Sequence, residues 1–352
     1  MDASLQEIST TVRINDVHAA ATSPDLEAVA SPAAAEAAWL RRDWKLRLLR
    51  SAMHMLSRLH PASAVRLFDR IWFTAPRTRP RPDARHWLPR GERKTHRVHG
   101  REVVSWSWGA GPTVLLLHGW GGHGAQMHAF VPPLLEAGFR VVMFDAPAHG
   151  ASGPSRLGGN RVTFIEIVDA LRVVAASTGP LAGLIAHSGG CAVAALALRD
   201  GWQGPRRMTF VAPFALPSAA IEPFASTVGA SAAVAAAFRE QAERRLARAW
   251  EDFDIPALPG VRELPPLLVV HDREDREVPF FNGETVASAW PGANLLATDG
   301  LGHRRLLRDP GTVARIVGFM MPEASVTRGV PADARGELDH DYARSGLSHA
   351  RC

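Results

Sequence analysis

The feature that most constrains the fold is a series of short, continuously apolar segments that alternate with helical segments between residues 113 and 321. A strand that is apolar on both sides needs cover on both faces, which is typical of a parallel sheet with crossover helices. The sequence therefore predicts an α/β fold with a mostly parallel central sheet flanked by helices. The predicted strands are 113–117, 139–144, 181–186, 208–212, 267–271 and 293–297, preceded by a hairpin at 97–108. The predicted helices are 125–137, 162–178, 190–199 and 312–321.

A serine stands where one of these strands turns into a helix. Residues 186–190 read Ala-His-Ser-Gly-Gly, between an apolar strand and an Ala- and Leu-rich helix. Small neighbours two positions either side let strand and helix approach closely, and such a turn lifts the hydroxyl clear of the sheet edge. Ser188 is therefore the candidate nucleophile.

A serine hydroxyl needs a histidine to take its proton, and that histidine needs an acid to fix its tautomer. Asp275 follows the strand 267–271, and His303 follows the strand 293–297. Because the carboxyl ends of parallel strands share one edge, Ser188, Asp275 and His303 are expected to meet there. Asp272 is the alternative acid.

With these residues, the chain resembles the α/β-hydrolase superfamily over about residues 97–321. The resemblance rests on the motifs at 118–122 (His-Gly-Trp-Gly-Gly) and 145–153 (Asp-Ala-Pro-Ala-His-Gly-Ala-Ser-Gly), on the serine turn, and on the Asp/His pair. Ala186 departs from the glycine usual in that turn. The family's acid is typically followed by x-x-Val-Pro, which favours Asp275 over Asp272. The resemblance implies a serine hydrolase and no narrower family with an assigned reaction.

The expected reaction is hydrolysis of a carboxylic ester through an acyl-enzyme on Ser188, with His303 as general base and acid and Asp275 orienting it. Backbone N–H groups of Trp120 and Gly189 are expected to hold the oxyanion. The reaction requires no metal and no organic cofactor. Amide, lactone and thioester substrates stay open.

Substrate choice is assigned to a helical lid insertion at 214–265. Apolar walls are expected from Phe214, Phe224, Phe238, Trp250 and Phe253, with Trp120 and Met127 opposite. Such a pocket favours a small-molecule acyl substrate of apolar character.

Two alternatives compete with a hydrolase. The loop Gly119–Gly124 fits G-x-G-x-x-G, and Asp145 stands near where a ribose-binding acid would be, which suggests a dinucleotide-binding oxidoreductase. Against this, a reductase that uses a catalytic tyrosine and lysine is not available, because the sole tyrosine is Tyr342 in the C-terminal tail. The second alternative is a non-catalytic binding protein of the same fold. His118, His149 and His187 are interpreted as structural, and Asp145 as a brace of its loop.

The segments outside the sheet are expected to form an N-terminal arm and two tails. Residues 1–36 and 323–352 are predicted to be disordered, and 37–94 to be a basic helical arm with an extended Pro/Arg-rich linker at 76–89. Residues 41–101 hold 17 lysines and arginines against 4 acidic residues, without the aromatic interleaving or module typical of nucleic-acid binding. The arm is expected to pack on its own hydrolase domain; the alternatives are a homodimer contact or an anionic membrane surface.

The remaining composition favours a cytoplasmic protein. No apolar run reaches the length of a transmembrane helix, and the start of the sequence lacks a basic-then-apolar signal pattern. The cysteine count of 2 cannot form a disulfide framework.

Overall fold

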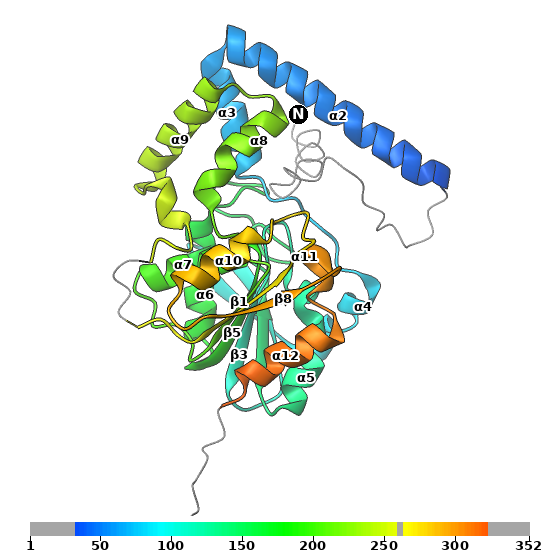
Figure 1. Ribbon diagram of the computed structural model, residues 1–352, viewed down its shortest axis with the longest axis vertical. Coiled ribbons are helices and arrows are strands. Elements are labelled where there is room, and N and C mark those ends of the chain that lie inside the picture. The colour runs from blue at the N-terminus through cyan, green and yellow to red at the C-terminus, as the bar shows by residue number, and fades with distance from the viewer. Residues whose placement is uncertain (1–31, 259–262, 323–352) are drawn as a thin grey trace, which may run out of the picture. The chain divides into compact units, whose positions relative to one another are not determined.

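The computed structural model describes residues 32–258 and 263–322. Within them, one eight-stranded sheet has the order β1-β2-β4-β3-β5-β6-β7-β8 (Figure 1). Strands β1 and β2 form the predicted hairpin, and β2 pairs antiparallel with β4, whereas all later pairs are parallel. The strands are β1 (Glu92–Val98), β2 (Arg101–Trp108), β3 (Thr113–Leu117), β4 (Arg140–Phe144), β5 (Leu181–His187), β6 (Met208–Val211), β7 (Leu267–Asp272) and β8 (Asn294–Thr298).

Helices cover both faces of this sheet, which confirms the predicted α/β class. In β3, Leu115 and Leu117 face the core beneath α6 (Phe164–Ala176), α7 (Gly189–Arg199) and α10 (Phe281–Ala289). Val114 and Leu116 face the opposite core, beneath the 3₁₀ helix η3 (Gly124–Phe130), α5 (Val131–Glu136) and α12 (Pro310–Met320). This alternation follows from the two-residue period of a strand with both sides buried.

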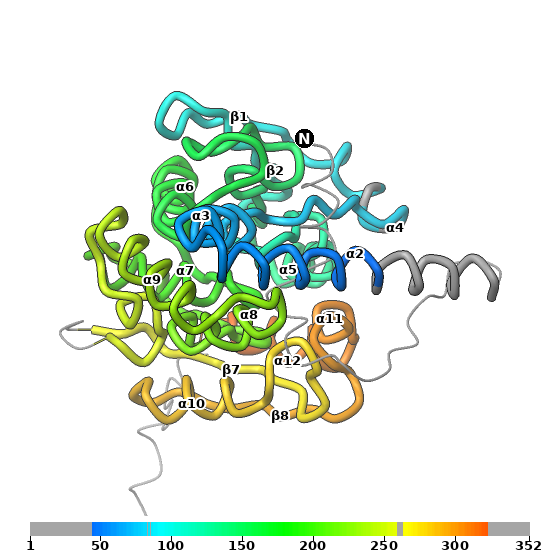
Figure 2. The backbone as a smooth tube through the Cα atoms, turned by 90° about the horizontal axis from the view of Figure 1, so that it is seen from above, coloured from blue at the N-terminus to red at the C-terminus, as the bar shows by residue number. Residues whose placement is uncertain are grey.

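A layer of helices from two distant segments lies over the carboxyl edge of the sheet (Figures 1 and 2). Before the sheet come α2 (Pro32–Leu59) and α3 (Pro61–Trp72). Between β6 and β7 come the 3₁₀ helices η4 (Pro217–Ala220) and η5 (Trp250–Phe253), with α8 (Ile221–Val228) and α9 (Ala232–Leu246). Helix α3 packs on α9, and α2 packs on α3 and α8. We call α3, α8, α9, η4 and η5 the cap.

Aromatic side chains hold the cap together. Phe68 of α3 is fully buried, with its ring 5.3 Å from that of Phe224 and 4.7 Å from that of Phe238. Asp69 binds Arg161 of the main domain at 2.9 Å and Arg245 of α9 at 2.7 Å. The apolar side of α3 therefore packs within its own chain, as predicted for the arm. The prediction fails for part of α2, where Trp44, Leu48, Met55 and Leu59 are exposed.

Several elements differ from the sequence expectations. Helix α2 begins at Pro32, inside the segment 1–36 that was predicted to be disordered, because its alanine-rich start favours a helix without apolar periodicity. The linker 76–89 is not extended throughout: Pro82 starts the short helix α4 (Pro82–Arg85), and η2 (Leu88–Arg90) follows. The segment 125–137 divides into η3 and α5.

The sequence analysis also missed two helices, α10 and α11 (Gly302–Arg305). The segments 1–31 and 323–352, which carry most of the predicted disorder, lie outside the described residues. Across 32–258 and 263–322, no helix is both long and apolar enough to cross a membrane.

Candidate active site

Ser188 lies between the end of β5 and the start of α7, in the strand-to-helix turn that the sequence predicted, and its backbone is strained. The φ and ψ angles of Ser188 are 53° and −123°, and the residue is only 2% exposed. The turn is crowded: a Cβ added to Gly119 would lie 2.8 Å from the Ser188 Cβ, and one added to Gly190 would lie 2.6 Å from the His118 carbonyl oxygen. Only glycine fits at these two positions, so the tight turn fixes where the hydroxyl emerges.

Asp275 and His303 are in direct contact, although 28 positions separate them. His303 lies on α11, and its Nδ1 donates to Asp275 Oδ2 at 2.8 Å with both side chains buried. The other carboxylate oxygen, Oδ1, accepts from the backbone N–H groups of Glu277 and Val278. Since the carboxylate only accepts, the proton sits on His303 Nδ1 and leaves the Nε2 lone pair available.

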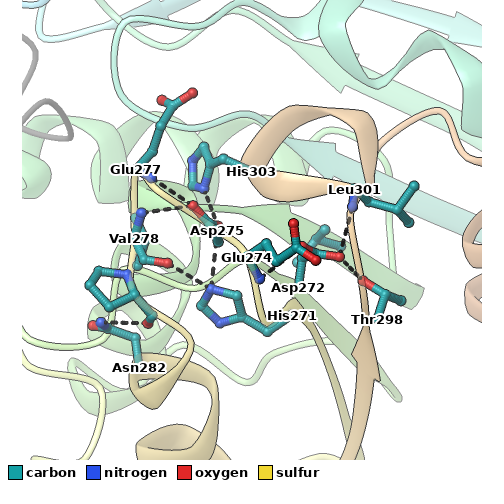
Figure 3. A network of polar contacts seen from close by, with 12 residues as sticks. His271, Asp272, Glu274, Asp275, Glu277, Val278, Asn282, Thr298, Leu301 and His303 are labelled. Carbon is teal, nitrogen blue, oxygen red and sulfur yellow. Dashed lines mark hydrogen bonds and ion pairs between the residues drawn. The ribbon is translucent and has the colours of Figure 1, made fainter. Parts of the chain in front are cut away.

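A second histidine, which the sequence analysis missed, binds the same carboxylate oxygen (Figure 3). His271 ends β7, and its Nε2 lies 3.3 Å from Asp275 Oδ2 and 3.0 Å from the Val278 carbonyl oxygen. Both neighbours are acceptors, so His271 carries its proton on Nε2. Burial alone would raise the pKa of Asp275, but the electrostatic interaction with His303 and the hydrogen bonds from His271 and His303 hold that pKa well below its ordinary value.

Asp272, the alternative acid in the sequence analysis, does not orient the histidine. Its Oδ2 accepts from the Thr298 hydroxyl at 2.7 Å and from the Leu301 N–H at 2.9 Å (Figure 3). Burial opposes the charge, yet these hydrogen bonds hold the pKa of Asp272 below its ordinary value. Asp272 therefore fixes the loop that leads to His303 and does not contact the His303 ring.

His187 holds His303 from the other side. Its Nε2 lies 3.1 Å from the His303 carbonyl oxygen, and the two rings are 4.7 Å apart. Burial lowers the pKa of His187 well below its ordinary value, so the ring is neutral and donates this hydrogen bond. The structural role predicted for His187 is confirmed.

The loop after β3 carries the Trp120 N–H group beside Ser188. A Cβ added to Gly189 would lie 3.5 Å from the Trp120 backbone nitrogen, so the two expected oxyanion donors are close neighbours. His118 Nδ1 donates to the Gly119 carbonyl at 2.7 Å, and His149 Nε2 accepts from the Gly121 N–H at 2.9 Å. These two buried imidazoles fix the loop on both sides of Trp120, which confirms their predicted structural roles.

Asp145 braces the same region, as predicted. Its carboxylate accepts from the N–H groups of Gly124 and Ala151, each at 2.6 Å. The glycine loop itself is covered, since a Cβ on Gly121 would meet Pro76 at 2.7 Å, and Thr78 donates to the Gly121 carbonyl. A loop that is packed in this way has no open face for a pyrophosphate, which argues against the dinucleotide alternative.

A narrow apolar cavity lies against Ser188 and Gly189. The volume of this cavity is about 40 Å³. Trp120 and Phe214 line it, as predicted for substrate binding, together with Trp250 and Phe253. The remaining lining residues are Trp72, Phe73, Val162, Thr163, Phe164, Pro217 and Leu246.

Three residues predicted to bind substrate do not line this cavity. Met127 is fully buried in the core on the other face of the sheet, because η3 turns it there. Phe224 and Phe238 are fully buried in the cap, where their rings contact Phe68. Their place in the cavity wall is taken by Trp72 and Phe73, from the end of α3.

No group of acidic, cysteine and histidine side chains suited to a metal ion occurs in the part of the chain that the structure describes. Cys191 is buried in α7. Burial raises its pKa well above the ordinary value, so it remains an unreactive thiol.

Comparisons with known proteins agree with this fold. The sequence profile of the "Alpha/beta hydrolase family" matches residues 114–316. A stretch of 44 residues is 52% identical to a pimeloyl-[acyl-carrier protein] methyl ester esterase of Methylococcus capsulatus, but it spans 12% of this chain and 17% of that relative.

Solved structures show the same fold at low sequence identity. A bromoperoxidase from Bacillus anthracis is 18% identical with a TM-score of 0.51, covering 65% of this chain and 99% of that one. A thioesterase domain from the curacin biosynthetic pathway is 16% identical with a TM-score of 0.50, covering 66% of this chain and 99% of that one.

Proposed function

Because the chain belongs to the alpha/beta hydrolase family, we propose that it hydrolyses a carboxylic ester through an acyl-enzyme on Ser188. The observation that carries the proposal is the buried contact between His303 Nδ1 and Asp275 Oδ2. Ser188 stands in a strained turn directly after His187, whose ring binds the His303 carbonyl oxygen. A non-catalytic binding protein would have no use for a charged, fully hydrogen-bonded carboxylate beside a histidine with one free ring nitrogen.

The reaction begins when the Ser188 oxygen attacks the carbonyl carbon of the ester and its proton passes to His303 Nε2. Asp275 stabilises the imidazolium that results. The carbonyl oxygen becomes an oxyanion, and the N–H groups of Trp120 and Gly189 donate to it; loss of one such donor typically costs on the order of 10²–10³ in rate.

Collapse of this intermediate breaks the ester bond, and the departing alcohol takes the proton from His303. Water then attacks the acyl-enzyme while His303 accepts one of its protons. The acid leaves, Ser188 regains its proton from His303, and the site returns to its starting state. Apart from the ester and water, these steps use only groups of the chain itself.

The cavity supports an apolar acyl group as the part of the substrate nearest Ser188. Its walls are aromatic and aliphatic side chains from the cap and from Trp120 and Phe164. The small open volume favours short or medium acyl chains. Amides, lactones and thioesters present the same carbonyl geometry, so acyl-chain shape rather than the leaving group is the specificity we assign to this cavity.

A fluorophosphonate probe tests the nucleophile directly. Wild-type protein is expected to label stoichiometrically, and Ser188→Ala not at all, whereas Ser51→Ala, on an exposed turn of α2, should label as wild type. A panel of p-nitrophenyl esters of graded acyl length, with matched amides, lactones and thioesters, then defines the substrate. Wild-type protein that takes up no probe under native conditions would overturn the hydrolase in favour of a binding protein.

A further inference from the structure

Large exposed apolar side chains gather on one helix of this protein. Of the eight such residues among those described, four lie on α2: Trp44, Leu48, Met55 and Leu59, which are 52%, 59%, 57% and 67% exposed. The others stand on separate elements: Val173, Phe281, Leu295 and Met321. Single exposed apolar residues are ordinary, but a cluster of this kind marks an interaction surface.

The four α2 residues form one continuous strip, which we call the apolar stripe. At 100° per residue, positions 44, 48, 55 and 59 fall within an arc of about 60° and extend over about 22 Å. The stripe is not the side that holds α2 to the cap, because Leu49 and Met53 on the opposite side are the buried residues. Figure 2 shows α2 lying across the outside of α3 and α8.

A basic strip runs beside the apolar stripe. Arg47, Arg50 and Arg58 are exposed on the next face of the helix, within an arc of about 80°. The sequence has no aspartate or glutamate from Trp44 to Leu59. This strip decides between occupants: a second copy would bring like charges together, whereas an anionic surface attracts each arginine.

We propose that α2 lies flat on an anionic lipid surface. The apolar stripe enters the boundary between headgroups and acyl chains, and Arg47, Arg50 and Arg58 face the lipid phosphates. The indole of Trp44 is suited to this boundary because it is both apolar and a hydrogen-bond donor. The contact is peripheral and does not depend on the hydrolase chemistry.

Vesicle co-sedimentation of the full chain tests the contact. We expect binding to vesicles of equal parts phosphatidylglycerol and phosphatidylcholine at 0.05 M NaCl, weakened about tenfold or more at 0.5 M, and little binding to phosphatidylcholine alone. Replacing Arg47, Arg50 and Arg58 by glutamine should weaken vesicle binding about 100-fold, because the loss of each arginine weakens it by about tenfold or less. Trp44→Ser, Leu48→Ser and Met55→Ser together should weaken it by at least about tenfold.

A matched variant controls for general stickiness. Val173→Ser, Phe281→Ser and Leu295→Ser together remove three exposed apolar side chains elsewhere and should leave vesicle binding unchanged. Brominated lipids should quench wild-type fluorescence more than that of Trp44→Phe, since only the former has an indole in the stripe. Labelling of Ser188 by the fluorophosphonate probe reports separately on the catalytic proposal.

Three outcomes overturn the proposal. The first is wild-type protein that stays in the supernatant with anionic vesicles at low salt. The second is a dimer in solution that the triple serine variant of α2 converts to monomer, which would assign the stripe to a second copy. The third is binding by a chain that starts at Pro32 but not by the full chain, which would mean that residues 1–31 cover the stripe.

Discussion

At the scale of single residues, the Asp275 carboxylate is the most highly constrained group of the candidate site. One oxygen accepts from His303 and His271, and the other accepts two backbone N–H groups. A carboxylate with its acceptor positions filled in this way cannot rotate, so it fixes the ring of His303 in one plane. It also stays ionised, as the lowered pKa of Asp275 requires.

Asp275→Asn should lower kcat by about 10⁴-fold, because the amide no longer selects the tautomer that leaves His303 Nε2 unprotonated. Asp272→Asn is the matched control: it removes the same charge three positions away but leaves the His303 contact intact. We expect it to retain activity within about tenfold and to lower the free energy of unfolding by about 1–3 kcal/mol. Ester hydrolysis and urea unfolding of both variants check this, and equal losses of kcat would contradict it.

Some of these residues could be predicted from sequence and others could not. Ser188, Asp275 and His303 follow separate strands, and parallel strands bring their carboxyl ends to one edge, so order along the chain predicted where these residues lie. The choice of Asp275 over Asp272 came from the x-x-Val-Pro pattern of the family that the chain resembles. His271 was missed because its role depends on the orientation of a buried ring. The only sequence signal was its place at the end of β7, four residues before Asp275.

At the scale of elements, α3 contributes to the cavity from a part of the sequence far from the candidate catalytic residues. Phe73, at the end of α3, lines the cavity, whereas Phe68 on the same helix is buried in the cap. Both are almost fully buried, so loss of either should destabilise the protein by about 3–5 kcal/mol. Only Phe73 should affect substrate choice.

Phe73→Ala should therefore enlarge the cavity and favour longer acyl chains. If two further methylene groups become buried, at about 0.8 kcal/mol each, the ratio of kcat/KM for a longer ester to that for acetate should rise about tenfold. Phe68→Ala should lower the melting temperature to a similar extent without changing that ratio. A kinetic comparison over graded p-nitrophenyl esters, with thermal unfolding alongside, distinguishes the two; a parallel shift in both variants would exclude a direct role for Phe73.

The strands could be predicted because short, continuously apolar runs are typical of strands that are buried on both faces. Helices α10 and α11 could not be predicted. Helix α10 contains Gly283, where a Cβ would lie 2.7 Å from His271 Nδ1, so packing rather than helix propensity set that residue. Helix α11 is a single turn at His303. Trp72 and Phe73 line the same cavity as Ser188, although more than 100 positions separate them from it in the sequence. No local sequence pattern predicts such a contact.

At the scale of the whole molecule, two buried histidines make stability depend on pH. Burial lowers the pKa of His118 from 6.5 to about 4 and that of His149 from 6.5 to about 3. Their rings are 5.1 Å apart and stay neutral in the folded protein, whereas both take up protons near pH 6.5 when the chain unfolds. The unfolded state therefore binds more protons below pH 6.5, and the folded state loses stability as the pH falls.

We expect the free energy of unfolding to decrease between pH 6.5 and pH 4 by about 3 kcal/mol from His118 alone. His149→Gln should be less stable at pH 7, where it loses the hydrogen bond to the Pro147 carbonyl, yet lose less stability on acidification. Urea unfolding at pH 7 and pH 4.5 measures both slopes. Identical pH dependence in wild type and variant would contradict the assignment, and Ser51→Ala supplies the baseline.

Trp72 and Phe73 precede residue 114, where the match to the family profile starts. The proposed catalytic residues and part of the cavity wall therefore lie in separate parts of the sequence. Under the proposed function, a substitution at Trp72 or Phe73 would change which acyl groups fit and leave Ser188, Asp275 and His303 unchanged. Relatives with the same motifs at the candidate site are therefore expected to differ in acyl selectivity where the sequence equivalent to Trp72 and Phe73 differs.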